Sequence, residues 1–212
     1  MDCRNRRPHI IGVDEVGRGS LAGPITVAAV AARISEKRSA KSDKLKKFLR
    51  GIRDSKKLSP KQREEWFRNL SLFTCHSSLV WAISSVGSAT IDRIGISRAA
   101  TLAVGRCMRK LTINYGLRTL NSKILLDGSL YAPRTYQNQE TIIRGDERIP
   151  LIAAASIIAK VTRDGMMTHF DSRYSLYGLA IHKGYGTAMH RAAIIRHGPC
   201  ALHRASFCKK LH

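Results

Sequence analysis

The sequence predicts an α/β fold in which a mixed central β-sheet is flanked by helices. Short β-branched runs, typical of buried strands, occur at residues 10–16, 24–30, 77–86, 123–126 and 141–143. Segments with helical periodicity lie between and after the later runs. Because the first runs follow each other as a meander and the later ones alternate with helices, we expect antiparallel and parallel pairs in one sheet.

Size and charge narrow the class of protein. The chain has 212 residues, 43% hydrophobic and 25% charged, which predicts one globular domain over residues 1–212. Its last part, at about residues 175–212, reads as helix and loop. The 37 Lys and Arg exceed the 15 Asp and Glu and leave a net charge of +22. That excess favours binding to nucleic acid, with a merely solvated basic surface as the alternative.

The cysteine pattern predicts a reduced, cytoplasmic protein, since the five cysteines are odd in number and form no C-x-x-C pair. A zinc-knuckle-like spacing occurs at Cys200, His203, Cys208 and His212. Its ligand order is wrong, so we do not expect zinc there. No apolar stretch has the roughly 18 residues that a membrane span needs, and the N-terminus does not resemble a signal peptide. We therefore expect no membrane partner. We also expect a monomer.

The first third of the chain predicts a hairpin followed by a basic segment. The strand at residues 10–16 is stopped by Gly17, and Pro24 begins the second strand, where a missing amide is tolerated. Residues 36–57 are dense in Lys, Arg and Ser, which predicts a solvated loop or a short helix. Ser59 has the position of an N-cap and Pro60 that of a first helical residue, so a helix begins there.

Strands and helices alternate in the remainder. After the strand at residues 77–86, Thr90 opens a helix whose apolar face runs from Ile96 to Leu111. The strand at residues 123–126 ends at Asp127, and the strand at residues 141–143 leads to Asp146. After Pro150 comes a helix, small on one side, that we expect to pack closely on the sheet.

Acidic residues follow three of the predicted strands, namely Asp14 with Glu15, Asp127 and Asp146. One buried acid at a strand end is usually a cap or half of an ion pair. Several on one sheet edge would repel one another unless cations neutralise them, and an all-oxygen set selects Mg²⁺ or Mn²⁺. Two such ions can hydrolyse a phosphodiester. Because neighbouring strand residues point to opposite faces, either the strand distorts at Val16 and Gly17 or Glu15 reaches round its edge.

Three loops offer contacts to a nucleic acid. The glycines flanking Arg18 leave the backbone open to a phosphate or a sugar hydroxyl, although a plain tight turn gives the same pattern. The spacing to Gly23 and the strand that follows exclude a dinucleotide-binding fingerprint. Lysines at residues 56, 57 and 183 could equally face solvent. Tyr185, between two glycines, is held out of the core and can stack on a sugar or a base.

Six stretches carry a resemblance to a known family: G-V-D-E-V-G-R-G with L-A-G-P (12–24), D-S-K-K-L-S (54–59), L-D-G (126–128), G-D-E-R-I-P (145–150), A-A-S-I-I-A-K-V-T-R-D (154–164) and H-K-G-Y-G-T (182–187). In this order, over nearly the whole chain, they resemble type 2 ribonuclease H, the prokaryotic ribonuclease HII. The resemblance implies an RNase H-like fold with a helical C-terminal extension that helps to clamp a duplex.

The resemblance also implies an activity and the residues that carry it. Family members cut the RNA strand of RNA/DNA hybrids and incise 5′ of a ribonucleotide in duplex DNA, leaving a 5′-phosphate and a 3′-hydroxyl, in ribonucleotide removal and repair. The implied catalytic and metal-binding residues, for two Mn²⁺ or Mg²⁺ ions, are Asp14, Glu15, Asp127 and Asp146. The implied substrate-binding residues are Gly17, Arg18, Gly19, Lys56, Lys57, Tyr185 and Thr187. Asp164 also matches the family pattern, but we expect it to be a structural residue of its helix rather than a catalytic one. Whether a sliding clamp is a partner stays open.

The chain departs from the family pattern at three positions. Ser20 stands where proline is common, Gly95 where asparagine opens a helix, and Leu151 where serine is common. Gly95 is expected to weaken that helix start by up to about 1 kcal/mol. Two other classes of protein compete with a nuclease. A binding protein that had lost catalysis would be expected to lack one of the four acids, and a ribosomal-type basic protein would leave them unexplained.

Overall fold

The computed structural model describes residues 9–33, 40–52, 55–74 and 79–209. Five strands form one sheet in the order β3-β2-β1-β4-β5: β1 His9–Val16, β2 Ile25–Arg33, β3 Leu79–Val86, β4 Lys123–Asp127 and β5 Gln139–Ile142. The pairs β1–β2 and β2–β3 are antiparallel, whereas β1–β4 and β4–β5 are parallel. The prediction of an α/β fold with a mixed sheet is therefore confirmed.

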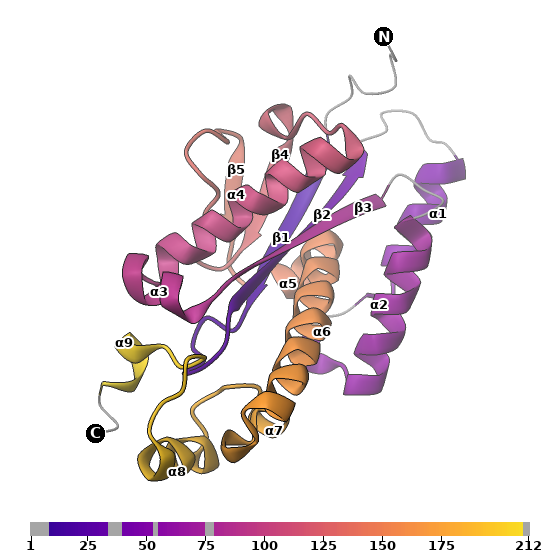
Figure 1. Cartoon of the computed structure of the whole chain (residues 1–212). Helices are drawn as coiled ribbons and strands as arrows, with labels where there is room; N and C mark the ends of the chain where they lie inside the picture. The colour runs from indigo at the N-terminus through magenta and orange to yellow at the C-terminus, as the bar shows by residue number, and fades with distance from the viewer. Residues whose placement is uncertain (1–8, 34–39, 53–54, 75–78, 210–212) are drawn as a thin grey trace.

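Helices cover both faces of this sheet (Figure 1). The helix α4 (Ile96–Tyr115) lies on one face, and α6 (Pro150–Arg173) lies on the other together with α1 (Ala40–Leu49) and α2 (Pro60–Thr74). The short helices are α3 (Ser88–Ile94), α5 (Gly145–Arg148), α7 (Leu179–His182), α8 (Ala188–His197) and α9 (Ala205–Cys208), with 3-10 turns η2 (Ser55–Lys57), η3 (Thr119–Asn121) and η4 (Ser175–Tyr177). Within the described residues, no helix combines the length and the apolar character needed to cross a bilayer.

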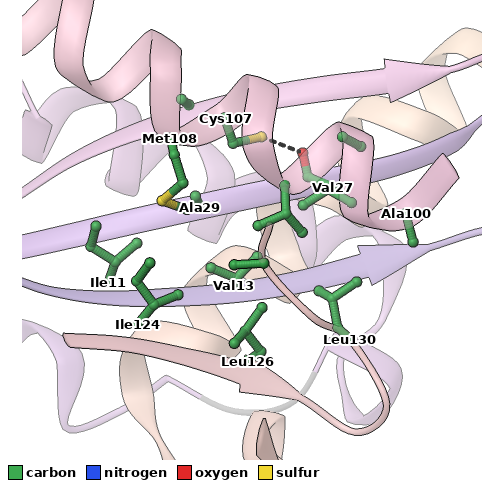
Figure 2. Packing of buried hydrophobic residues seen from close by; sticks show 14 of the residues in the cluster. Ile11, Val13, Val27, Ala29, Ala100, Cys107, Met108, Ile124, Leu126 and Leu130 are labelled. Carbon is green, nitrogen blue, oxygen red and sulfur yellow. Dashed lines mark hydrogen bonds between the residues drawn. The ribbon is translucent and has the colours of Figure 1, made fainter. Parts of the chain in front are cut away.

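The alternation of β1 decides which of its residues meet the core under α4 and which meet α6. Ile11 and Val13 are fully buried in the cluster beneath α4, where the Cys107 thiol donates a hydrogen bond of 3.4 Å to the Val27 carbonyl (Figure 2). Gly12 faces the other way, because a Cβ there would lie 2.4 Å from the carbonyl carbon of Leu151 in α6. Asp14, two residues further on, shares the α6 face.

The sequence signals at both large helices of this second face are confirmed. At the start of α2, the Gln62 N–H donates to the Ser59 hydroxyl and the Ser59 N–H donates to the Gln62 side chain, which makes a reciprocal capping box. Pro150 occupies the first turn of α6. The small residues at positions 153–155 and 159 are buried against the sheet, which lets the helix approach β1 closely.

Three predicted elements differ in the structure. The single helix expected from Thr90 is two helices, α3 and α4, that meet at Gly95, whose φ of 82° lies where other residues are strained. The strand expected at residues 141–143 is β5, at Gln139–Ile142, and Asp146 lies in α5 rather than at a strand end. The strand expected at residues 77–86 begins at Leu79, and positions 77 and 78 lie outside the described residues. In the basic segment 36–57, α1 and η2 form.

The C-terminal elements gather at the end of the sheet where β1 leads into β2 (Figure 1). Tyr177, Ile194 and Cys208 form an apolar cluster with Met167 of α6 and Ala22 of the β1–β2 loop. Residue 22 also pairs with His203 in an isolated antiparallel bridge. The loop between β1 and β2 is thereby held from behind by the last segment of the chain.

Candidate metal centre and nucleic-acid site

Three carboxylates meet at one edge of the sheet. Asp14, Asp127 and Asp146 each offer an oxygen, and these atoms all lie within 4.8 Å of one another. Asp14 and Asp127 are neighbours because β1 and β4 run parallel with Val13 beside Leu126. Asp146 comes from the first turn of α5. Its predicted position at a strand end was wrong, but its predicted convergence with the other two acids is what the structure shows.

Asp127 itself brings α5 into place. Its Oδ1 accepts hydrogen bonds from the N–H groups of Gly145, at 2.7 Å, and Asp146, at 3.3 Å. A carboxylate at a helix start satisfies amides that have no partner within the helix. Residue 145 must be small, because a Cβ there would lie 2.7 Å from Cδ1 of Ile152 and 3.3 Å from the Asp127 carboxylate. The hydrogen bonds from the start of α5 to Asp127 therefore fix Asp127 and Asp146 relative to each other.

The pKa of Asp14 is raised well above its ordinary value, first by burial and then by repulsion from Glu15 and Asp127. A hydrogen bond from Ser156 opposes this shift. The Ser156 hydroxyl also lies 2.7 Å from that of Ser55, so η2 is linked to the acids. Hard carboxylate oxygens that repel one another are the donor set that a divalent cation such as Mg²⁺ or Mn²⁺ relieves, so the residues fit the predicted ions.

Glu15 lies beside this set of three acids. The ladder between β1 and β2 stays regular through Val16, so the strand does not distort there, and the turn begins only at Gly17, with φ of 86°. The Glu15 carboxylate accepts a hydrogen bond of 2.8 Å from Nε of Arg18. Its negative charge still acts on Asp14. The role of Glu15 as a metal ligand stays a prediction.

The glycine turn after β1 is enclosed on one side and open on the other. A Cβ at Gly17 would lie 2.2 Å from Nε of the buried Arg163, whereas a Cβ at Gly19 would meet no atom within 4 Å. The carbonyls of Gly17 and Arg18 accept hydrogen bonds of 2.7 and 2.9 Å from Arg204, which is also fully buried. The turn is therefore a fixed backbone surface that a ligand can approach at Gly19.

Tyr185 is brought to the same place by a second loop. The N–H groups of Leu21 and Ala22 both donate to the carbonyl of Gly184, at 2.9 and 3.2 Å. The centre of the Tyr185 ring lies 5.5 Å from the guanidinium carbon of Arg163 and 5.8 Å from Nζ of Lys160. These hydrogen bonds join the loop of residues 17–19 to the loop of Tyr185, which we predicted to bind substrate together.

The other predicted contact residues have structural partners. Lys57 forms an ion pair of 3.3 Å with Glu147, and the side chain of Lys56 lies outside the described residues. Thr187 is the N-cap of α8, where its hydroxyl accepts from the N–H of His190 at 3.3 Å. Neither contact tests whether these residues bind substrate.

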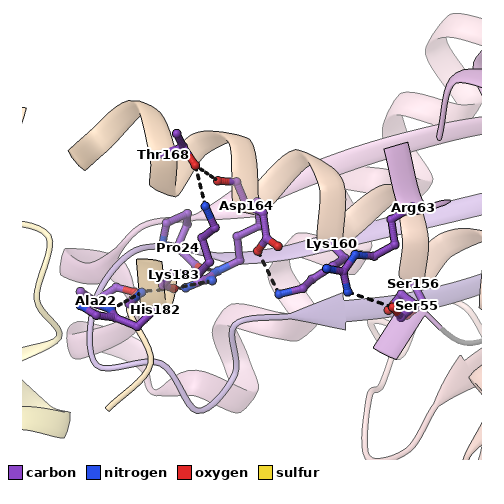
Figure 3. A network of polar contacts seen from close by, with 12 residues as sticks. Ala22, Pro24, Ser55, Arg63, Ser156, Lys160, Asp164, Thr168, His182 and Lys183 are labelled. Carbon is purple, nitrogen blue, oxygen red and sulfur yellow. Dashed lines mark hydrogen bonds and ion pairs between the residues drawn. The ribbon is translucent and has the colours of Figure 1, made fainter. Parts of the chain in front are cut away.

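A hollow of about 780 Å³ lies between α2 and α6, and Arg63, Lys160, Asp164 and Lys183 are among its lining residues. Two contacts hold its walls: Lys160 pairs with Asp164 at 3.0 Å, and Nζ of Lys183 donates to the Thr168 hydroxyl at 2.6 Å (Figure 3). The partner of Asp164 is on the same helix, and its structural role stays a prediction. The hollow brings both signs of charge together beside the site.

In the cysteine and histidine pattern near the C-terminus, burial lowers the pKa of His203 below its ordinary value. The Cys200 thiol is 3.2 Å from Nδ1 of His203, and the Cys208 thiol faces the Leu21 carbonyl at 4.0 Å. His212 lies outside the described residues. Cys200, Cys208 and Cys107 are free thiols.

The sequence interpretation missed Arg163 and Arg204, the two arginines that hold the site's backbone. Arg163 could have been found, because it lies four residues from both Ala159 and Met167, which places it on the buried face of the helix. No comparable signal identifies Arg204, which contacts the turn across 187 residues of sequence.

Similarity to known proteins extends over most of the chain. A model of the ribonuclease HII family matches residues 11–210. A ribonuclease HII of Coxiella burnetii is 42% identical over 93% of this chain and 87% of its own length. One of Caldicellulosiruptor bescii is 40% identical over 95% of this chain and 87% of its own length.

Solved structures confirm the fold. A ribonuclease HII of Archaeoglobus fulgidus, solved in complex with PCNA, has a TM-score of 0.70 at 22% identity over 96% of each chain. A Bst-RNase HIII solved with Mn²⁺ has a TM-score of 0.72 at 18% identity, over 98% of this chain and 70% of its own. The family match and the two close relatives show that the chain belongs to the ribonuclease HII family, whose members are divalent-metal-dependent endoribonucleases of the ribonuclease H type.

Proposed function

We propose that this enzyme incises the strand 5′ of a ribonucleotide embedded in duplex DNA, besides cutting the RNA strand of RNA/DNA hybrids, and leaves a 5′-phosphate and a 3′-hydroxyl. The observation that carries the proposal is the convergence of Asp14, Asp127 and Asp146 beside the open glycine turn. The net charge of +22 supports a nucleic-acid duplex as the substrate.

The proposed metal ligands are the three convergent acids and Glu15. Bound Mg²⁺ or Mn²⁺, as a pair, would supply a nucleophilic hydroxide and stabilise the leaving 3′-oxygen. Asp127 has a second role, since it also caps α5 and so holds Asp146 in position. Ser156 orients the carboxylate of Asp14 by a hydrogen bond.

The proposed ribose sensor consists of Gly17, Arg18 and Gly19, whose backbone would bind the 2′-hydroxyl, and Tyr185, whose ring would stack on the following deoxyribose. Support comes from the open space over Gly19 and from the direct packing of the Gly184 carbonyl on the loop after the turn. Lys56, Lys57 and Thr187 are proposed to contact the substrate backbone. A contact with a sliding clamp stays a prediction.

A cleavage assay on a duplex with one ribonucleotide tests the proposal. Asp127→Asn is expected to abolish cleavage in Mg²⁺ and in Mn²⁺, because it removes a ligand charge. Asp43→Asn is the matched control, since this acid is exposed on α1. Full activity of Asp127→Asn would contradict the metal-site assignment. Equal cleavage of the 2′-deoxy duplex would contradict the sensor.

A further inference from the structure

We propose that Arg204 is the positioning residue of the ribose sensor: from behind, it turns the peptide groups of the glycine turn so that their N–H groups face the substrate. This inference rests on the sensor role proposed above for residues 17–19. It concerns a residue near the end of the chain that touches neither the acids nor the open side of the turn.

The first observation is the set of partners that Arg204 has. Its side chain is 0% exposed. In the part of the chain that the structure describes, all its hydrogen bonds go to backbone carbonyls, those of Gly17 at 2.7 Å, Arg18 at 2.9 Å, and Gly23 at 2.9 and 3.1 Å. A buried cation is costly unless its donors are satisfied, so this guanidinium is retained against a desolvation penalty. Its hydrogen bonds fix the orientation of the Gly17, Arg18 and Gly23 carbonyls.

The second observation is the geometry of the peptide group. In a trans peptide the C=O and N–H bonds point in opposite directions. The carbonyls of Gly17 and Arg18 point inward to Arg204, so the N–H groups of Arg18 and Gly19, in the same two peptide planes, point outward. Neither N–H donates to a backbone carbonyl within the described residues. Two adjacent donors are thereby presented on the open side of the turn.

Arg163 supports the arrangement from the neighbouring side. It is also 0% exposed and donates to the carbonyls of Ala22, Pro24 and Lys183, at 3.2, 2.9 and 2.8 Å. The last contact ties the loop of Tyr185 to the loop of the turn. Burial and the nearby Arg163 charge lower the pKa of Arg204 to about 10, so the Arg204 guanidinium stays charged at neutral pH.

The segment around Arg204 is itself anchored. The Gly23 N–H donates to the Leu202 carbonyl, and the Arg204 N–H donates to the Leu21 carbonyl, at 2.9 and 2.8 Å. Asp92 of α3 accepts hydrogen bonds from the N–H groups of residues 205 and 206. The contacts with Asp92 anchor the segment of Arg204 to α3, outside the loop that carries the turn, as a positioning role requires.

The test is a binding measurement that needs no catalysis. Fluorescence anisotropy in EDTA compares a duplex containing one ribonucleotide with the same all-DNA duplex. The wild type is expected to prefer the ribonucleotide duplex. Arg204→Gln and Arg204→Lys are expected to reduce that preference about tenfold, the worth of roughly one hydrogen bond, while their affinity for all-DNA duplex changes little. Lysine keeps the charge but lacks the planar fork.

Arg196→Gln is the matched control, because this arginine is exposed on α8 and its loss also removes one positive charge. It is expected to weaken binding of both duplexes equally and to keep their ratio. Circular dichroism and Mn²⁺ titration establish that the Arg204 variants fold and keep the acid cluster. An unchanged preference in a folded Arg204 variant would overturn the positioning role alone. A wild type without any preference would overturn the sensor, and this inference with it.

A second measurement on the wild type covers the case in which the Arg204 variants do not fold. Amide hydrogen exchange is followed with each duplex bound. The amides of Arg18 and Gly19 are expected to be protected several-fold more by the ribonucleotide duplex than by the all-DNA duplex. Equal protection by both duplexes would overturn the proposed orientation of these donors.

Discussion

Substitution of the first glycine of the turn tests how tightly the site is built. Gly17→Ala places a Cβ 2.2 Å from Nε and 2.7 Å from Cζ of Arg163, at a backbone φ of 86°. A non-glycine residue in such a conformation costs about 1–3 kcal/mol. Arg163 must also move, and losing one of its hydrogen bonds to a carbonyl costs about 1.5–3 kcal/mol. Together these terms predict a loss of about 2.5–6 kcal/mol.

Thermal unfolding measures this loss. For a chain of this size, each kcal/mol shifts Tm by about 2–4 °C, so Gly17→Ala is expected to lower Tm by roughly 5–24 °C. Gly19→Ala is the matched control, because a Cβ at Gly19 meets no atom within 4 Å. It is expected to change stability by less than about 0.5 kcal/mol, yet to impair cleavage of the ribonucleotide duplex by occupying the open side of the turn. A Gly17→Ala protein as stable as the wild type would refute the packing described here.

Three further predictions concern single side chains. Because the pKa of Asp14 is raised in the fold, its contribution to stability decreases as pH rises above the unfolded value of about 3.9. Asp14→Asn is therefore expected to raise Tm of the metal-free protein at pH 7 and to leave it unchanged near pH 3, and a lower Tm at pH 7 would contradict this. Burial, aided by the neighbouring His182 and His203, lowers the pKa of His190 to about 4. The contribution of His190 to stability is therefore complete above about pH 6.5 and is lost as pH falls toward 4. An NMR titration is expected to find the His190 ring still neutral at about pH 5.5. The buried hydroxyl of Ser20 has no hydrogen-bond partner among the described residues. Chemical denaturation is therefore expected to show that Ser20→Ala stabilises the protein by about 1 kcal/mol. A loss of stability would show that the hydroxyl has a hydrogen-bond partner.

The parts of the fold that follow from local pattern could be predicted from the sequence. The strands and the N-cap at Ser59 depend on neighbouring residues, and so does the position of Asp14 and Asp127 near the ends of their strands. Gly95 was expected only to weaken a helix, because its φ of 82°, which separates α3 from α4, depends on how those helices pack.

The support of the site could not be predicted in this way. Asp146 reaches the other acids because Asp127 caps α5, a contact between side chain and backbone that no periodicity signals. Arg204 reaches Gly17 across most of the chain, and an arginine next to a histidine is an ordinary surface pattern in sequence. The reacting groups were visible in the sequence because their chemistry is rare, whereas the groups that hold them use common residues in uncommon places.

The most direct test of the account is to map the cut in a duplex with one embedded ribonucleotide by mass spectrometry of both products in Mn²⁺. Hydrolysis by water at the acid cluster predicts a cut on the 5′ side of the ribonucleotide, with a 3′-hydroxyl on one product and a 5′-phosphate on the other. A cut on the 3′ side that leaves a 2′,3′-cyclic phosphate would show that the ribose hydroxyl attacks, and would contradict both the metal centre and the sensor.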